Sequence, residues 1–142
     1  MKDTKKTTTD PGLQGNEKIE AAIAGLQQEA SQERLAHVLT VIRRRMQEKG
    51  PLIIAVEPFT ADGGIQVQAV QTADGENWWM AFTDFEEELK GGDGVKSTFL
   101  TDMDKLFQTA ADVEEIKGII LNPWNRTLML DKYLLNIIMG KI

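Results

Sequence analysis

Apolar residues recur at helical spacing in two stretches near the start of the chain. Between about Glu17 and Glu29, the residues Ile19, Ile23 and Leu26 lie three or four positions apart, which predicts a helix with a narrow apolar stripe. Ser31 can cap a second helix, which ends before Gly50-Pro51. Its stripe is longer and consists of Leu35, Val38, Leu39, Ile42 and Met46. A stripe of this kind is typical of a helix that covers a sheet, although it is also open to a partner.

The middle of the chain changes to the patterns of strands. Residues 52–56 form a continuous apolar run, and residues 65–69 alternate between apolar and polar side chains. Residues 77–82 are rich in aromatic side chains, and Asp74-Gly75 marks a hairpin turn before them. These signals predict a three-stranded antiparallel meander.

The segment that follows carries the signature of a helix start. Thr83 can cap a helix over residues 83–90, with Glu86 three positions further on, which is the spacing of a capping box. Glu86, Glu87 and Glu88 place negative charge at the positive end of the helix dipole. Gly91 and Gly92 are expected to end this helix.

The last third predicts further strands and helices, and completes the fold class. We expect a short strand over residues 95–100, a helix over 102–111 and a hairpin of residues 118–121 and 127–130. Asp131 can cap a closing helix. The sequence therefore predicts an α+β fold: a mainly antiparallel sheet, made of a meander plus a later hairpin, packed with helices and preceded by two N-terminal helices. We expect a disordered segment over residues 1–15 and one domain over residues 16–142.

Charge is distributed unevenly along the chain. The net charge is −6, but the first 50 residues hold nine Lys or Arg against seven Asp or Glu, and the remainder holds seven against fifteen. An acidic main body argues against nucleic acid as a partner, because phosphate contacts need clustered cations. The one basic cluster, Arg43-Arg44-Arg45 with Lys49, is interpreted as a solvated helix end.

The composition removes several kinds of chemistry. Without cysteine the chain has no disulfide, thiol nucleophile or thiolate metal site. His37 is the single histidine and cannot form a standard zinc site, so we interpret it as structural or solvated. No metal or cofactor is predicted, and no nucleophile–base pair is recognised, which favours a protein that is not an enzyme. No apolar run could span a bilayer, and residues 1–15 lack a secretory signal. We therefore expect a cytoplasmic protein with no membrane partner.

Two motifs and their spacing resemble a known family. Phe82-Thr83-Asp84 follows a strand, Gly118-Ile119-Ile120-Leu121-Asn122-Pro123 comes some thirty-five residues later, and a terminal helix starts near Asp131. In this order, over roughly residues 31–142, the chain resembles the bacterial SseB N-terminal-like domain, named for enhanced serine sensitivity. The resemblance implies a small α+β domain and assigns no reaction.

The first functional hypothesis is an interaction or regulatory module with an unidentified protein partner. Trp78, Trp79 and Trp124 supply aromatic anchors of the kind found at interfaces. Because neighbouring residues of a strand point to opposite faces, Trp78 or Trp79 is expected to lie away from the main core. The alternative is that both are simply covered. The narrow apolar stripe of the first helix could also form the contact of a homo-oligomer through the N-terminal helices.

The second hypothesis is a small-molecule site, enzymatic or not. Thr83, Asp84, Asn122 and Asn125 all come just after strands. If those strands are parallel neighbours, the four groups would converge on a polar cleft for an amine or an amino acid. The structural interpretation of these residues as caps and turns is favoured over this one.

Overall fold

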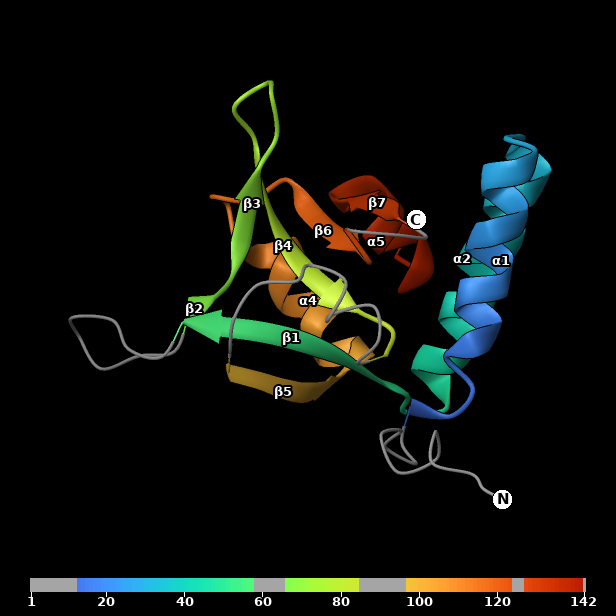
Figure 1. The fold of residues 1–142 in the computed structure, drawn as a ribbon, viewed down its shortest axis with the longest axis horizontal. Helices are drawn as coiled ribbons and strands as arrows, with labels where there is room; N and C mark the ends of the chain where they lie inside the picture. The colour runs from blue at the N-terminus through green and yellow to red at the C-terminus, as the bar shows by residue number, and fades with distance from the viewer. Residues whose placement is uncertain (1–12, 58–65, 85–96, 124–126, 142) are drawn as a thin grey trace, which may run out of the picture.

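The computed structural model of the protein describes residues 13–57, 66–84, 97–123 and 127–141, and its elements are labelled in Figure 1. The helices are α1 (Glu17–Gln28), α2 (Gln32–Gln47), α4 (Met103–Asp112) and α5 (Lys132–Ile138). The strands are β1 (Pro51–Glu57), β2 (Gln66–Val67), β3 (Ala69–Gln71), β4 (Asn77–Phe82), β5 (Ser97–Asp102), β6 (Gly118–Leu121) and β7 (Leu128–Asp131). The predicted α+β class, with two helices before the sheet, is confirmed.

All the strands belong to one mixed sheet, with the path β2-β1-β4-β6-β7. Most pairs are antiparallel, as predicted, but β4 and β6 run parallel. The reason is the route of the chain between them. After β4 it pairs β5 with the other side of β1, and it then returns through α4 to place β6 beside β4.

The predicted middle strand of the meander is bent into two pieces. β2 runs antiparallel along β1, and β3 runs antiparallel along β4, although β1 and β4 also pair directly with each other. The bend lies at Gln68, whose N–H donates to Ala55 O at 2.8 Å and whose carbonyl accepts from Met80 N at 3.2 Å. Gln68 therefore fills the fork where β1 and β4 separate.

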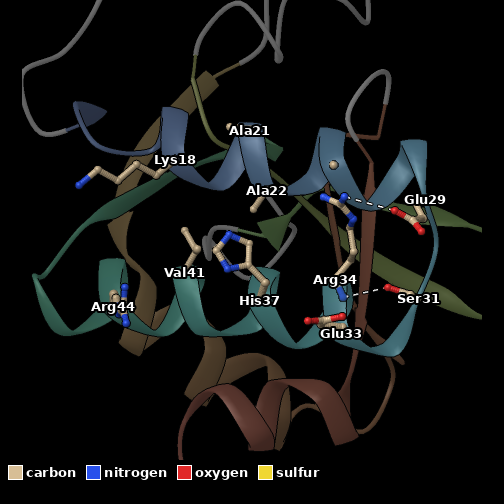
Figure 2. Close-up of a pocket in the computed structure, with 11 residues that line it drawn as sticks. Lys18, Ala21, Ala22, Glu29, Ser31, Glu33, Arg34, His37, Val41 and Arg44 are labelled. Atoms are coloured by element: carbon tan, nitrogen blue, oxygen red, sulfur yellow. Dashed lines mark hydrogen bonds and ion pairs between the residues drawn. The ribbon is translucent and has the colours of Figure 1, made fainter.

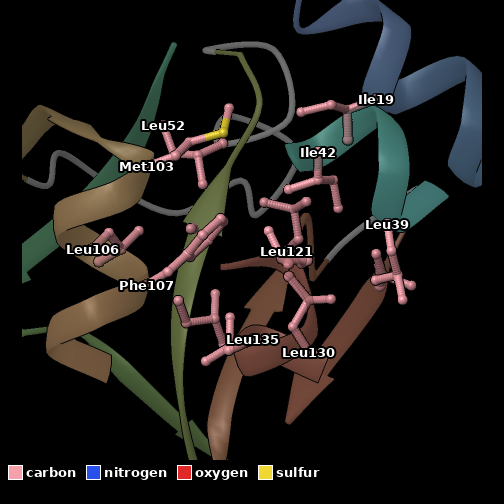
Figure 3. Packing of buried hydrophobic residues seen from close by; sticks show 14 of the residues in the cluster. Ile19, Leu39, Ile42, Leu52, Met103, Leu106, Phe107, Leu121, Leu130 and Leu135 are labelled. Carbon is pink, nitrogen blue, oxygen red and sulfur yellow. The ribbon is translucent and has the colours of Figure 1, made fainter. Parts of the chain in front are cut away.

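The main core lies between the sheet and the helices. The apolar stripes of α1, α2, α4 and α5 join one face of the strands in a single cluster, and Phe107 lies inside it with no exposed surface (Figure 3). Ile19 and Ile23 of α1 are also fully buried in this cluster. The stripe of the first helix is therefore used within the chain, and any homo-oligomer would have to use another surface of the N-terminal helices.

The opposite face of the sheet carries a smaller apolar cluster. Ile53, Met80 and Phe82 are buried there, and Leu13 packs against them with 3% of its surface exposed. The expectation of disorder over residues 1–15 is thus wrong at its end, because burial of the Leu13 side chain fixes this part of the chain. Residues 1–12 lie outside the described part of the protein, where the expectation stays a prediction.

Two predicted helix caps are present. The hydroxyl of Ser31 accepts from Arg34 N–H at 3.1 Å, and the carboxylate of Asp131 accepts from Leu134 N–H at 2.9 Å. The predicted capping box differs, since the hydroxyl of Thr83 donates to Glu20 on α1. Glu86, with the rest of the helix predicted over residues 85–90, lies outside the described residues. None of the helices within the described ranges is long and apolar enough to cross a bilayer.

Candidate functional site

Thr83 and Asn122 meet at the carboxyl ends of the two parallel strands, β4 and β6. Thr83 N–H donates to Asn122 Oδ1 at 2.9 Å, and Asn122 Nδ2 donates to Thr83 Oγ1 at 3.1 Å. Asn122 N–H donates to Ala81 O at 2.8 Å, and its φ of 53° lies in the left-handed region that asparagine tolerates better than most residues. The convergence expected from parallel neighbouring strands is therefore observed for these two residues.

The first turn of α1 completes this cluster from the far end of the sequence. Thr83 Oγ1 donates to Glu20 Oε2 at 2.5 Å. Asn16, just before α1, donates through Nδ2 to Pro51 O at 2.9 Å and to Thr83 O at 3.0 Å. The side chains of α1 thus occupy the place above the parallel strands where an α/β sheet often leaves room for a ligand.

Arg45 brings α2 into the same cluster. Its Nε donates to Asn16 Oδ1 at 2.9 Å, and its Nη1 donates to Glu48 Oε1 at 2.9 Å. The guanidinium lies between two glycines, because a Cβ on Gly15 would come within 2.8 Å of it and a Cβ on Gly50 within 2.7 Å. Larger residues would fill the space that Arg45 needs.

We call Asn16, Glu20, Arg45, Thr83 and Asn122 the polar network. These five are the buried polar or charged residues of the described chain, with exposed fractions between 0 and 8%. Buried polar groups are costly unless they are hydrogen-bonded, and each of these side chains has a partner within the network. The polar network therefore links α1 and α2 to the ends of β4 and β6 by buried hydrogen bonds, an arrangement that we call an internal tie.

The sequence contained a signal for Arg45 that its basic neighbours concealed. Arg45 continues the buried stripe of α2 at helical spacing after Val38 and Ile42. The interpretation of the three arginines as a solvated helix end is wrong for this residue. Arg43 is also engaged, since it donates to the carbonyls of Ile137 and Ile138 at the end of α5.

Asp84 does not join Thr83 and Asn122 in a described pocket. Its side chain is half-buried. The groove between α1 and α2 and the pocket beside α5, both lined by described residues, include neither Asp84 nor Asn122. The small-molecule hypothesis therefore gains the predicted convergence, which lies in neither of these two pockets. Trp124, with Asn125, lies outside the described residues, and its binding role stays a prediction.

The adjacent tryptophans point to opposite faces of β4, as expected. Trp78 lies on the face of Met80 and Phe82 with 6% of its surface exposed, and Trp79 is half-buried against the main core. The Nε1 of Trp78 is buried without a hydrogen-bond partner among the described residues. Neither indole is an open anchor in this chain, so a role in binding stays a prediction for both.

Among the described residues, three of the four exposed large apolar side chains lie on the edge strands β5 and β7. Phe99 is 49% and Leu100 is 40% exposed on β5, and Met129 on β7 and Tyr133 on α5 are also exposed. Leu100 pairs with Ile53 and Phe99 with Ile54, so the two side chains of β5 project to opposite faces. Sequence analysis missed this edge because the strand was predicted without its place in the sheet.

The backbone of β5 also presents hydrogen-bonding groups outward. Met103 N–H donates to Gly50 O at 3.1 Å, which places this pair in the hydrogen-bonded position of an antiparallel ladder. Alternation then turns the N–H and C=O groups of Phe99 and Thr101 toward β1, and those of Thr98 and Leu100 away from it. Within the described residues, β1 is the only strand that pairs with β5.

Other chemistry within the described residues is limited. No group of three or more His, Asp or Glu side chains is placed there to hold a metal ion. The pKa of Asp74 is lowered by the Thr72 hydroxyl, and the pKa of Asp104 is lowered by the hydrogen bond from Lys49; both carboxyls are on the surface.

Comparison with known proteins leaves the family open. No protein-family model matches the chain, and no curated protein or solved structure is significantly similar to it. Fold and site define an α+β domain with an internal polar network and, among the described residues, a strand β5 that is paired on one side only. The resemblance to the SseB N-terminal-like domain stays a prediction.

Proposed function

We propose that the chain is a non-catalytic interaction module that binds an extended segment of a protein partner along β5. The observation that carries the proposal is a six-residue edge strand whose backbone N–H and C=O groups alternately point away from β1. The same strand exposes two apolar side chains, Phe99 and Leu100, one on each face of the sheet. Strand addition uses these two elements: the main chain gives affinity, and alternate side chains give specificity.

The composition of β5 supports the same proposal. Edge strands are commonly protected from pairing by lysine, proline or a bulge. The segment Ser97-Thr98-Phe99-Leu100-Thr101-Asp102 contains no lysine, arginine or proline, and all six residues pair with β1 in unbroken register. Its β-branched and aromatic residues suit a strand with neighbours on both sides.

A small-molecule site at Asp84 and Asn122 is the second candidate, and one observation favours it. The polar groups expected to converge do so at the ends of parallel strands, which is a common place for ligands. The proposal is weaker than the first because the side chains of Thr83 and Asn122 already satisfy each other and Glu20. The resemblance to the SseB domain and a cytoplasmic location are compatible with either function.

Photo-crosslinking tests the proposed partner site. Phe99 is replaced by p-benzoylphenylalanine in the full chain, which is then irradiated in extract of its source cell, and captured proteins are identified by mass spectrometry. A second preparation carries the crosslinker at Tyr133, which is more exposed at 61% and lies on α5. The proposal expects a partner that is captured from position 99 and not from position 133.

Thr98→Pro supplies the control for strand addition. Proline removes an outward N–H while leaving the ladder to β1 intact, and it is tolerated on sheet edges. It should abolish the capture at position 99, whereas Thr98→Val, which keeps the N–H, should not. Equal capture from both crosslinker positions, or capture that survives Thr98→Pro in a folded chain, would refute binding along β5.

A further inference from the structure

A groove with a volume of about 820 Å³ runs along the outer side of the two N-terminal helices. All eleven lining residues come from α1, α2 and their connection, as Figure 2 shows. We call this the α1–α2 groove. The side chains of His37 and Val41 rise from α2 toward Ala22 of α1. His37 is therefore an exposed residue of a groove wall.

Two matched stripes form the walls of the groove. Lys18, Ala22, Gly25 and Glu29 follow helical spacing along α1, and Arg34, His37, Val41 and Arg44 follow it along α2. Because the helices are antiparallel, Lys18 and Arg44 belong to one end, and Glu29 and Arg34 to the other. From Lys18 to Glu29 the groove extends over about 16 Å, or three helical turns.

The two ends differ in charge. At one end Arg34 Nη2 is paired with Glu29 Oε1 at 3.3 Å. At the other, neither Lys18 nor Arg44 has a side-chain hydrogen bond or ion pair to a described residue. Lys18 also lies in the first turn of α1, where the helix dipole favours anions. Within the described residues Lys18 therefore has no stabilising partner, and this end of the groove attracts negative charge.

We propose that the α1–α2 groove binds a helix of a partner protein whose acidic first turn lies between Lys18 and Arg44. This site is separate from β5 and does not depend on the strand-addition proposal. Acidic residues are common in the first turn of helices, so the required charge falls at a natural position of the ligand. A third helix laid in the groove between two others is a frequent mode of recognition.

The shape of the groove favours a helix over a free small molecule. Small-molecule pockets typically enclose most of the ligand surface, whereas this groove is half open to solvent between the α1 and α2 walls. The α1 wall carries Ala21 and Ala22 between Lys18 and the Arg34 guanidinium, which covers Gly25, and alanine side chains allow a helix backbone to approach closely. The ligand should therefore be acidic at one end and apolar where it meets Ala22 and Val41.

Selection from a displayed peptide library tests the site with a defined probe. The library consists of amphipathic helices of about 18 residues, long enough to hold helical structure, with the exposed and end positions randomised. It is selected on the full chain, with the double variant Lys18→Glu/Arg44→Glu as the competing target. The proposal expects enriched sequences with Asp or Glu in the first turn and apolar residues facing the groove.

Affinity and position are then measured on individual peptides. Reversing both charges should weaken binding by about tenfold or more, because attraction becomes repulsion at the same end. The matched reversal Lys105→Glu/Lys117→Glu, outside the groove, should leave binding unchanged. Amide chemical shifts should move in residues 18–29 and 34–44 and not in β5.

Three results would overturn the proposal: no enrichment over the double variant, enriched helices without acidic first turns, or binding that is insensitive to Lys18→Glu/Arg44→Glu. Saturable binding of dodecanoate or phosphate at Lys18 and Arg44, with no helix selected, would replace the partner helix by a small anion. Thr98→Pro should have no effect, so failure here leaves the β5 proposal standing.

Discussion

The polar network and the α1–α2 groove are built from the same two helices, yet they differ in how their charges are satisfied. In the network, Arg45 is 8% exposed and donates to Asn16 and Glu48. In the groove, Arg44 is exposed and has no side-chain partner among the described residues. The two arginines are adjacent in sequence and have opposite environments.

The difference shows that burial and partners, rather than residue type, separate internal ties from binding surfaces. A buried charge must be paired or hydrogen-bonded inside the protein, because leaving it unpaired costs several kcal/mol. An exposed charge is hydrated and can remain available for a ligand at little cost. The same helix can therefore stabilise the fold on one side and recognise a partner on the other.

The largest expected effect is the loss of Arg45. Arg45→Ala should lower the free energy of unfolding by about 3 kcal/mol, since it leaves the buried Oδ1 of Asn16 without its donor and empties the buried space that the arginine side chain fills. Urea denaturation followed by tryptophan fluorescence measures the change. A loss below about 1 kcal/mol would contradict an internal tie, because an ordinary surface substitution would account for it.

Asn122→Ala should follow, with a loss of about 2–3 kcal/mol. The substitution orphans the buried Thr83 N–H and removes the side chain that satisfies the threonine hydroxyl. Asn122→Gly separates the two causes, because glycine adopts φ 53° without strain and restores only the backbone part of the loss. If Asn122→Gly were as stable as the parent chain, the side-chain hydrogen bonds would contribute nothing.

Arg43→Ala should lower the free energy of unfolding by about 1 kcal/mol, which lies between the effects expected for Arg45→Ala and Arg44→Ala. Arg43 Nε donates to Ile138 O at 2.9 Å and a second nitrogen donates to Ile137 O, so it satisfies carbonyls at the end of α5. Faster hydrogen exchange confined to α5 would locate the loss. Exchange that rises throughout the sheet instead would place Arg43 in the global tie.

Arg44→Ala should change stability least, by no more than about 0.5 kcal/mol. The same variant should weaken binding of an acid-headed helix selected on the groove, because one of its two cations is gone. Thermal denaturation and fluorescence anisotropy give the two readings on one preparation. Arg44 would belong with the network instead if stability fell as much as in Arg45→Ala.

Much of this architecture could be predicted from local patterns. Helical spacing located α1 and α2, the apolar run located β1, and the caps at Ser31 and Asp131 were identified from single residues. These features depend on neighbours within a few positions, which the sequence displays directly. The meeting of Thr83 and Asn122 could also be predicted, because strand ends in a parallel pair lie at one edge.

What could not be predicted depends on contacts between distant segments. The partners of Thr83 include Glu20, which resembles an ordinary exposed acid of a first helical turn. The bend at Gln68 arises because β1 and β4 diverge, and no turn residue marks it. The exposure of Phe99 follows from its position at the sheet edge, and strand pattern alone does not distinguish edge from centre.

The contacts of α1 also set the order in which the protein can be completed. Thr83 follows Glu20 by 63 residues, and Asn122 follows Thr83 by 39. At about 5–20 residues per second, α1 is synthesised on the order of 5–20 seconds before β6. Until then the carboxylate of Glu20 can accept from Thr83, but Thr83 lacks the side chain of Asn122 beside it, so the polar network is incomplete. The polar network that fixes α1 is therefore completed only when β6 has been synthesised, long after the helix itself.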